Sequence, residues 1–491
     1  MMMNNVVKLR QFSCFLKSFS DIIKSDKTNM LARTRIHDFS RRRVMSFDMV
    51  IFYLIFRNRK NTDADLIKFF SALDILEKKV TRQALHKNIR KLNPSVFLYL
   101  FKQFASLFYS SGLGNTYRGY TILSEDGTFI EIPYMTYNIY YFGIWENKTV
   151  RNMFDVRKII SKSGGLYDVT NGFFVDFTMR DAPSSEIPLA FRHLYNTAHL
   201  YNDKKVIYLA DRYYGSMELI AFLESLNYKY CIRAKSNFYK KQISEMKRND
   251  DYITVHVDRK WLERMTLSYE ARNYIENNPN IRIRVVRKPY VYYDRSGRLA
   301  VQEMTYFTNL SKDEFDKRAI EELYSKRWDI ETAYRTLKTQ LELERHISRD
   351  VNVSQSCVYA KVLFFNIAGV ERKMINNALL SSPKITRNII DDNVTIHEYK
   401  YSAVNITQMI NCIYENNILK SLYEGDKRKL AKKIYQILKA CEKMKVPIRE
   451  NRHYERWGRV VPSGYYYRFS LDGRNFPKCK TIKGVMRTTK P

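Results

Sequence analysis

A change of pattern at Tyr117 limits the folds that are open to this chain. Before it the sequence is helical in character, and after it come runs rich in Val, Ile, Tyr and Phe that are typical of strands. The stretch YRGYTILSEDGTFIEIP predicts two strands joined by a tight turn at Asp126 and Gly127. Antiparallel strands are then followed by alternating helices and strands, among them KKVIYLAD, which ends at Asp211. This order predicts an α/β core whose first part is residues 116–235.

The N-terminal residues 1–115 are predicted to form a helical DNA-binding domain. Helical runs follow these cap signals: Ser46, Asp63 or Asp65, Thr81, and Asn93 with Pro94. The helix after Thr81 carries four basic side chains: Arg82, Lys87, Arg90 and Lys91. In a helix-turn-helix-like bundle such a helix lies along DNA. The alternative is a solvated basic face, because basic residues occur throughout the chain.

Three further segments follow the first part of the core. Residues 236–309 return to strand-like sequence, with a hairpin around Asp294 to Gly297, and predict an inserted, basic β subdomain. Residues 310–377 contain two long helical runs and are predicted to complete the core. Residues 378–491 are basic, are predicted to be helical, and end in the aromatic and basic run GYYYRFSLDGRNFPKCK. This last region is expected to bind DNA or to form a dimer contact.

One uninterrupted helix is predicted from near Asp313 and Glu314 to Leu343, because this run contains neither Gly nor Pro. With about 100° per residue, one border of the helix gathers a phenol, two bases and an acid. These four side chains are Tyr324, Arg327, Lys338 and Glu331. Two interpretations are open. An acid between two bases forms a ladder of surface ion pairs, or it holds a metal ion while its cationic neighbours bind a phosphodiester.

The chain carries a formal net charge of +33, from 84 Lys and Arg residues against 51 Asp and Glu residues. Because 45% of the 491 residues are hydrophobic, this charge lies on folded surfaces and repels itself unless a polyanion neutralises it. Nucleic acid is therefore the leading partner. An anionic membrane surface is the alternative, but the run from Met49 to Phe56 is too short to span a bilayer, and no membrane partner is expected.

The sequence lacks the usual signals of secretion, of zinc binding and of nucleotide binding. The N-terminal residues break their apolar runs with charge and lack a signal-peptide cleavage site, so the protein is expected to stay inside the cell. The six cysteines are scattered singly, without zinc spacing. No Gly-rich phosphate loop of the GxxxxGK type is present, and therefore no nucleotide cofactor is expected.

Three carboxylates stand out as candidate catalytic residues and metal ligands: Asp126, Asp211 and Glu331. Three acids can hold two metal ions during phosphoryl transfer. Each acid also has a plainer explanation. Asp126 with Gly127 is an ordinary turn signal, Asp211 could cap the helix that follows it, and Glu331 could belong to a ladder of ion pairs.

The helix from Tyr324 to Lys338 also resembles a known pattern. Its four border residues match the order and spacing of the Y-R-E-K signature of the insertion-sequence-four family of bacterial DDE transposases. EDGT at Asp126 resembles the first-aspartate block of that family, and LADRYYGS at Asp211 resembles the second. CIRAKS, which contains Arg233, is similar to the basic strand that follows. The resemblance covers roughly residues 30–375.

This resemblance implies a fold, a metal site and partners. It implies a ribonuclease H-like catalytic core in which Asp126, Asp211 and Glu331 hold two Mg²⁺ ions, with Mn²⁺ as a substitute. It also implies phosphate contacts from four side chains: Tyr324, Arg327, Lys338 and Arg233. Arg binds phosphate through paired hydrogen bonds and Lys binds it as a point charge. The expected partners are double-stranded DNA, as terminal inverted repeats and as target, and a second copy in a homodimeric synaptic complex in the bacterial cytoplasm, at the nucleoid.

Members of this family with a β insertion are associated with a hairpin on the transposon end, which requires a flipped base stacked on an aromatic ring. Trp261 is the predicted stacking residue and Trp328 is its rival, with core packing as the alternative for either.

Two neighbouring acids also allow a local shift of the site. Glu125 adjoins Asp126, and Asp329 nearly adjoins Glu331, although it would point about 160° away on the helix.

Together these features predict a transposase that binds its terminal inverted repeats, cleaves at its ends by metal-dependent hydrolysis and joins the 3′-hydroxyl ends to target DNA. One alternative is a catalytically idle DNA-binding relative that acts as a repressor. The three acids argue against it, since simple binding needs no carboxylates beside bound phosphates. The other alternative is a nuclease on the same core, which only a joined product would exclude.

Overall fold

The structure is a computed structural model. It describes residues 2–41, 43–58, 61–133, 135–144, 159–235, 237–293, 299–345, 348–379, 384–390, 393–399 and 402–447. The chain forms two compact units. The first contains Met1–Arg287 and Thr305–Ile448, and the second contains Lys288–Met304 and Arg449–Pro491. The predicted site residues all lie in the first unit. The predicted turn around Asp294 to Gly297 and the aromatic and basic C-terminal run lie outside the described residues.

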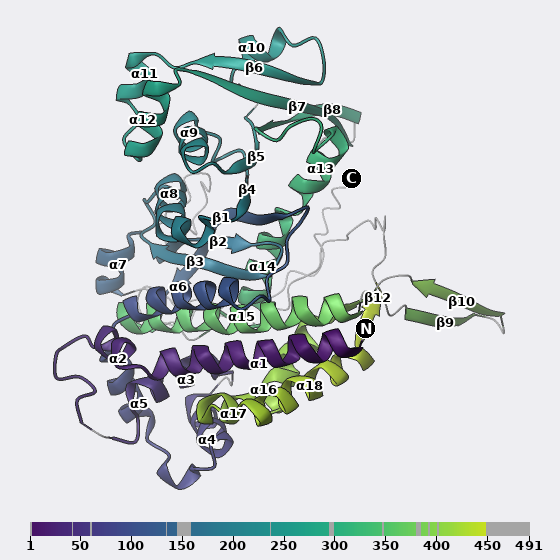
Figure 1. Cartoon of the computed structure of the whole chain (residues 1–491). Coiled ribbons are helices and arrows are strands. Elements are labelled where there is room, and N and C mark those ends of the chain that lie inside the picture. Colours follow the sequence, from purple (N-terminus) through teal and green to yellow (C-terminus); the bar gives the residue numbers. More distant parts are fainter. Residues whose placement is uncertain are drawn as a thin grey trace, which may run out of the picture. The chain divides into compact units, whose positions relative to one another are not determined.

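A large mixed sheet holds eight strands in the order β3-β2-β1-β4-β5-β8-β7-β6 (Figure 1). The strands are β1 (Tyr120–Ile132), β2 (Ile159–Asp168), β3 (Phe173–Arg180), β4 (Lys205–Ala210), β5 (Lys229–Arg233), β6 (Asp250–His256), β7 (Asn280–Tyr293) and β8 (Leu299–Thr308). β1, β4 and β5 run parallel, whereas β1–β2, β2–β3, β5–β8 and β6–β7 are antiparallel pairs. The predicted α/β class is confirmed. The predicted β insertion contributes β6, β7 and β8 to this same sheet.

The predicted turn at Asp126 and Gly127 is wrong, because β1 continues straight through both residues. Asp126 pairs with Gly165 of β2, and Gly127 pairs with Gly164. Gly127 does not take the positive φ that a two-residue hairpin turn demands. A local Asp-Gly preference is weak, and the ladder of hydrogen bonds along β2 overrides it.

Six helices form the N-terminal part of the chain: α1 (Met2–Lys24), α2 (Asp26–Ala32), α3 (Phe47–Phe56), α4 (Thr62–Ala72), α5 (Arg82–Arg90) and α6 (Ser95–Ser110). Thr81 caps α5 as predicted, since its side chain accepts a hydrogen bond from the Ala84 amide. Asn61 caps α4 in place of the predicted Asp63 or Asp65. Asp65 is instead buried and accepts a hydrogen bond from the Asn58 amide.

The helices between β1 and β8 connect the strands of the sheet. They are α7 (Thr136–Phe142), α8 (Glu186–Thr197), α9 (Met217–Ser225), α10 (Lys240–Ser244), α11 (Arg259–Glu263) and α12 (Tyr269–Asn277). α8 contacts β1, β2 and β3, and α9 contacts β5 and α12. The predicted alternation of strand and helix is present here, and β4 and β5 run parallel with α9 as their crossover.

The predicted long helix around Glu331 is two helices, α13 (Lys317–Ser325) and α14 (Trp328–Thr339). Asp316 caps α13, so the helix begins later than predicted. Between the two helices, the amide of Arg327 bonds to the carbonyl of Tyr324 three residues earlier, which tightens the turn. The break allows α13 to lie on β5 while α14 lies on β1. Neither Gly nor Pro marks this break in the sequence, because packing against two different strands causes it.

The C-terminal part contains α16 (Ile406–Glu415), α17 (Ile418–Glu424) and α18 (Lys427–Lys443). It is less uniformly helical than predicted, since it also holds two small antiparallel sheets. These sheets are formed by β9 (Lys384–Ile390) with β10 (Asn393–Tyr399), and by β11 (Ser402–Val404) with β12 (Lys445–Pro447).

The long helix α15 (Val351–Leu379) lies at the centre of the helical part (Figure 1). It contacts α3 and α6 from the N-terminal part, α16 from the C-terminal part and β3 of the sheet. Its span Val351–Asn377 is long and apolar enough to cross a membrane, but 94% of its most apolar window is buried inside the protein. This burial is what the central helix of a folded core requires.

Candidate active site

Asp126 and Asp211 lie on neighbouring parallel strands. The register pairs Ser124 of β1 with Leu209 of β4, so that two further residues along each strand bring Asp126 opposite Asp211. Neighbouring strands are about 4.8 Å apart. Asp211 lies just past the C-terminal end of β4, which is where open α/β sheets place their ligands.

Asp211 does not cap the helix that follows it, so the plainer explanation of this residue is wrong. Its Oδ1 accepts a hydrogen bond from the Tyr213 amide at 2.7 Å. The cap of α9 is Ser216, whose side chain accepts a hydrogen bond from the Leu219 amide. The Asp211 carboxylate therefore belongs to the loop between β4 and α9.

Helix α14 places Glu331 beside β1. The Tyr334 hydroxyl donates a hydrogen bond to the Asp126 carbonyl oxygen at 2.7 Å, and the Lys338 ammonium group donates to the Phe129 carbonyl. Tyr334 is buried against the sheet, where its ring packs on Phe174. These contacts fix α14 against β1 beside Asp126.

Arg327 connects two of the three acids. Its Nη2 atom lies 2.6 Å from Glu331 Oε1, and its Nη1 atom lies 3.6 Å from Asp126 Oδ2. The Arg327 side chain is only 8% exposed, so this pairing takes place largely away from water. The Glu331 ion pair is therefore part of the site and not an exposed surface ladder.

Asp126 is affected electrostatically by both other predicted acids. Burial raises the pKa of Asp126 to about 7, the nearby Arg327 charge opposes this rise, and the negative charges of Asp211 and Glu331 add to it. Asp126 therefore lies within electrostatic reach of Asp211 and Glu331.

The donor chemistry of this site fits a divalent cation. Carboxylate oxygens are the ligands that Mg²⁺ and Mn²⁺ prefer, and the Arg327 guanidinium pairs with two of the three acids. No three His, Cys, Asp or Glu side chains in the described part of the chain are already arranged as a metal cluster. Glu331 is turned toward Arg327, which satisfies the carboxylate in place of an ion.

The neighbouring acids do not substitute for the trio. The side chain of Glu125 is fully buried and pairs with His193 of α8, with 2.9 Å between Oε1 and Nδ1. Asp329 lies 3.6 Å from the Lys373 ammonium group of α15, so it points away from Glu331 as predicted. Both acids therefore have structural partners of their own.

Tyr324 lies beside the Arg327 guanidinium, with 5.7 Å between the guanidinium carbon and the ring centre. Tyr324 is buried against Tyr306 of β8, with 4.7 Å between their ring centres. Burial raises the pKa of the Tyr324 phenol, while the positive charges of Arg327 and Arg233 lower it, which places Arg233 near this ring. The Arg327 guanidinium also lies 5.5 Å from the centre of the Trp328 ring.

Neither predicted stacking residue belongs to the core. Trp328 is 57% exposed. Trp261 is half-buried on α11 and lines a hollow of about 410 Å³ together with Ser216, Glu218 and Arg264. Ser216 begins the helix that follows the Asp211 loop, so this hollow opens next to the second aspartate block.

The basic residues of α5 lie on a separate element. Leu85 and Ile89 are buried against α3, α4 and α15. Among the predicted DNA-binding residues, the exposed ones are Arg82, Lys87 and Arg90. Lys91 is half-buried. Arg90 lies 3.4 Å from Asp350.

Two residues near the acids were not predicted. Tyr334 could have been found from its spacing, because its place three residues after Glu331 puts it on the same side of α14. Glu186, at the start of α8, lies against Gly127. Nothing in the local sequence connects Glu186 with a strand nearly 60 residues earlier.

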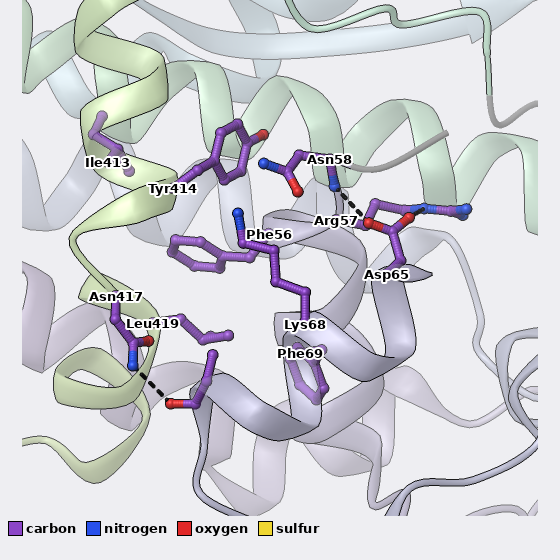
Figure 2. A pocket seen from close by; sticks show the side chains of 11 residues that line it. Phe56, Arg57, Asn58, Asp65, Lys68, Phe69, Ile413, Tyr414, Asn417 and Leu419 are labelled. Carbon is purple, nitrogen blue, oxygen red and sulfur yellow. Dashed lines mark hydrogen bonds and ion pairs between the residues drawn. The ribbon is translucent and has the colours of Figure 1, made fainter. Parts of the chain in front are cut away.

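A small cavity also lies away from the acids, between α3 and α4 on one side and α16 and α17 on the other (Figure 2). Its volume is about 30 Å³, which is room for one water molecule. Asp65 accepts the Asn58 amide at 3.0 Å there, and the Asn417 side chain donates to the Ala72 carbonyl at 2.9 Å. The cavity therefore belongs to the joint between helices and is too small for a ligand.

The fold and the acids define a class of protein: an α/β enzyme with a carboxylate site at the end of a parallel strand. Residues 118–367, slightly more than half of the chain, match the family model described as "Transposase DDE domain". The chain therefore belongs to this transposase family, whose members cleave DNA and transfer strands and generally use divalent metal ions.

Two other comparisons add little to the family assignment. No curated protein matches the chain. Among solved structures that match is the piggyBac transposase, determined by cryo-EM in a synaptic complex with hairpin DNA. It is 10% identical with a TM-score of 0.40, and the match covers 88% of this chain and 85% of that one. At this TM-score the likeness carries no further argument.

Proposed function

We propose that this protein is a cut-and-paste transposase of the insertion-sequence-four type, built on a ribonuclease H-like core. The position of Asp126 carries this proposal, because it lies opposite Asp211 on the neighbouring strand and shares the Arg327 guanidinium with Glu331. Three like charges in one partly buried site are unfavourable unless a cation joins them. The matched family and the spacing of the residues around Glu331 support the same conclusion.

In this proposal Asp126, Asp211 and Glu331 would hold two Mg²⁺ ions, which would supply activation of the attacking oxygen and stabilisation of the charge on the phosphate. Asp126 would supply a ligand from within β1, Asp211 from the end of β4, and Glu331 from α14. Arg327 then exchanges its carboxylate partners for a phosphate of the DNA end, to which it can donate two hydrogen bonds. Tyr334 holds α14 on β1 so that Glu331 keeps its place.

The other predicted contacts follow from their positions. Tyr324 lies beside Arg327, Arg233 lies near Tyr324, and both would hold phosphates near the cleaved bond. Lys338, about two turns after Glu331 on α14, would hold another phosphate. Trp261 is proposed to stack on a flipped base, because its hollow opens beside the Asp211 loop. Trp328, which is exposed next to Arg327, remains the rival.

The remaining parts of the chain bind partners in this proposal. The exposed side of α5 lies along the terminal inverted repeat, and the basic residues 378–491 contact DNA or a second protomer. Two protomers hold two DNA ends in a synaptic complex at the bacterial nucleoid. The reaction yields free 3′-hydroxyl ends, which attack target DNA.

A cleavage assay tests this proposal. Purified full-length protein is mixed with DNA that carries the inverted repeats flanking its gene, with Mg²⁺ or Mn²⁺, and the products are separated on a denaturing gel. Metal-dependent cuts at the repeat boundary are expected, and Glu331→Gln should abolish them. Asp329→Asn is the matched control, because it changes an acid on the same helix that points toward Lys373.

The products also separate the alternatives. Joined products after addition of target DNA would support the transposase, whereas cuts without joining would identify a nuclease. Bound but uncut DNA under both metals, with the wild-type protein and with Glu331→Gln alike, would contradict the proposal and favour a repressor.

A further inference from the structure

Glu186 is an acid beside the candidate active site with no assigned role. It is the first residue of α8, and its carboxylate lies directly against Gly127 of β1. A β-carbon added to Gly127 would lie 2.6 Å from Glu186 Cδ, 2.8 Å from Oε2 and 3.0 Å from Oε1. The missing side chain at this position therefore makes room for the carboxylate. Gly127 is also the residue after Asp126.

The same carboxylate reaches the loop that carries Asp211. The Tyr214 hydroxyl donates a hydrogen bond to Glu186 Oε2 at 3.1 Å. Tyr214 is only 1% exposed, and its amide bonds to the Asp211 carbonyl at 3.2 Å. Next to it, the hydroxyls of Ser185 and Tyr213 are 3.4 Å apart. The start of α8 is thus tied to the two residues that fold the loop back on Asp211.

A third contact comes from the neighbouring strand. The Lys162 ammonium group of β2 lies 3.9 Å from Glu186 Oε1, and the side chain of Glu186 is 21% exposed. At this exposure the ion pair alone is weak. The ion pair contributes to position and not to stability. With it, the single carboxylate of Glu186 contacts β1, β2 and the Asp211 loop.

These contacts matter because backbone pairing ends before the acids. The last paired residues of β1 and β4 are Ser124 and Leu209, so no strand-to-strand hydrogen bond holds Asp211 next to Asp126. The two carboxylates also repel each other. Some other group must keep the Asp211 loop near β1, and the chain of contacts from Gly127 through Glu186 to Tyr214 does so.

We propose that Glu186 is a positioning residue that holds the Asp211 loop against β1 at Gly127. It acts through Tyr214 and not by binding the substrate. The effect on metal binding rests on the function proposed above, whereas the effect on the loop does not.

Hydrogen–deuterium exchange of the full-length protein without metal tests the effect on the loop. Glu186→Ala and Tyr214→Phe should both speed exchange of the amides in residues 211–216. Gly127→Ala should have the same effect, because its new methyl group displaces the mobile end of the Glu186 side chain. Glu186→Gln should restore slow exchange, since an amide oxygen still accepts the Tyr214 hydroxyl. Unchanged exchange in both Glu186→Ala and Tyr214→Phe would overturn the inference.

Calorimetric titration with Mn²⁺ tests the consequence for the site. Glu186→Ala should lower the Mn²⁺ affinity about 10- to 100-fold, as is usual when a group that supports a metal ligand is removed. Binding of the DNA end in EDTA should stay unchanged. Glu270→Ala is the matched control, since Glu270 also lies in the first turn of a helix and accepts a tyrosine hydroxyl, from Tyr195.

The two proposals fail separately. If Asp211→Asn binds Mn²⁺ as the wild-type protein does, the metal site proposed above is wrong, while the exchange data still decide the role of Glu186. If Asp211→Asn loses Mn²⁺ but Glu186→Ala retains full affinity with slow loop exchange, Glu186 does not position the loop.

Discussion

At the scale of single residues, one guanidinium balances the charges of the acid site. Arg327 lies 2.6 Å from Glu331 and 3.6 Å from Asp126, so without a metal ion its charge offsets the repulsion between the acids. A divalent cation would compete for the same carboxylates. Metal binding would therefore free Arg327 to bind a phosphate. Arg327 would in this way couple metal binding to phosphate binding.

Arg327→Gln should make the metal-free protein less stable. Breaking a fully buried ion pair costs roughly 3–5 kcal/mol, and because Asp126 and Glu331 are 20% and 32% exposed we expect a loss of about 1–3 kcal/mol. Saturating Mn²⁺ should then raise the melting temperature more in the variant than in the wild type, since the ion replaces the missing charge. Thermal unfolding in EDTA and in Mn²⁺ measures both effects.

Arg318→Gln is the matched control for this experiment. Arg318 pairs with Glu322 on the exposed side of α13 at the same spacing of four residues. Its loss should change stability little and the Mn²⁺ effect not at all. Equal Mn²⁺ shifts for Arg327→Gln and the wild type would show that Arg327 does not balance the acids.

Glu371 should make stability depend on pH. It is fully buried in α15, neither carboxylate oxygen has a hydrogen-bond partner among the described residues, and burial raises its pKa from 4.5 to about 8. Between these two values the folded state binds more protons than the unfolded state, so stability falls as pH rises from 4.5 to 8. Glu371→Gln should remove this loss and stabilise the protein by about 3 kcal/mol at pH 7.

Urea unfolding at pH 5, 7 and 8 measures this difference between Glu371→Gln and the wild type. The gain should be small at pH 5 and largest at pH 8. The buried Lys361, whose pKa burial lowers to about 7, gives the opposite slope above pH 7, but it is present in both proteins and cancels. A gain that does not depend on pH would refute the assignment to Glu371.

At the scale of elements, two helices present basic faces to solvent. On α5 the exposed basic residues include Arg82 and Lys87, and on α18 they include Lys432 and Lys443. The opposite sides of both helices are buried. Both faces are basic and exposed, so only their arrangement relative to bound DNA can decide which one contacts phosphates.

The double variant Arg82→Ala with Lys87→Ala should weaken binding to the terminal repeat. Each lost phosphate contact lowers the slope of log K against log salt concentration by about 0.9, so the slope should fall by about 2. The double variant Lys432→Ala with Lys443→Ala removes the same net charge and is the control. Fluorescence anisotropy at several salt concentrations measures both slopes. Equal changes in the two variants would show a general effect of net charge and contradict a specific role of α5.

At the scale of the whole molecule, the two ends of the described chain pack together. α1 contacts α18, and the Ser20 hydroxyl donates to the Leu422 carbonyl at 2.7 Å. Phe364 of α15 stacks on Tyr414 of α16, with 4.5 Å between ring centres. The N-terminal and C-terminal helices therefore share one core around α15, and they are expected to unfold together.

Ile434→Ala in α18 should destabilise both ends of the chain. Ile434 is fully buried, and deleting its side chain is expected to cost about 2–5 kcal/mol. Hydrogen exchange should accelerate in α1 as well as in α18, because the two helices lose their shared packing. Tyr435→Ala, at a position that is 47% exposed on the same helix, is the control. Faster exchange in α18 alone would show that the ends fold independently.

Much of the active site could be predicted because its chemistry is written in residue type and spacing. The α/β class follows from apolar patterns that report which faces are buried. Asp126, Asp211 and Glu331 were proposed from sequence as acids beside a turn, at a strand end and on a helix, and in the structure Arg327 pairs with two of them. Their role as a catalytic trio stays a prediction. The proposed domain boundaries and the contacts with DNA stay predictions.

Tertiary structure alone decided the features that depend on partners far away in sequence. β2 keeps Asp126 and Gly127 in an extended strand where local preference favours a turn. Packing on two different strands divides the helix before Trp328, although no Gly or Pro marks the break. Glu186 meets Gly127 only because α8 lies across β1. A sequence pattern indicates the local preference of each residue and whether it is buried. The energy of these contacts depends instead on segments that meet only in the folded chain.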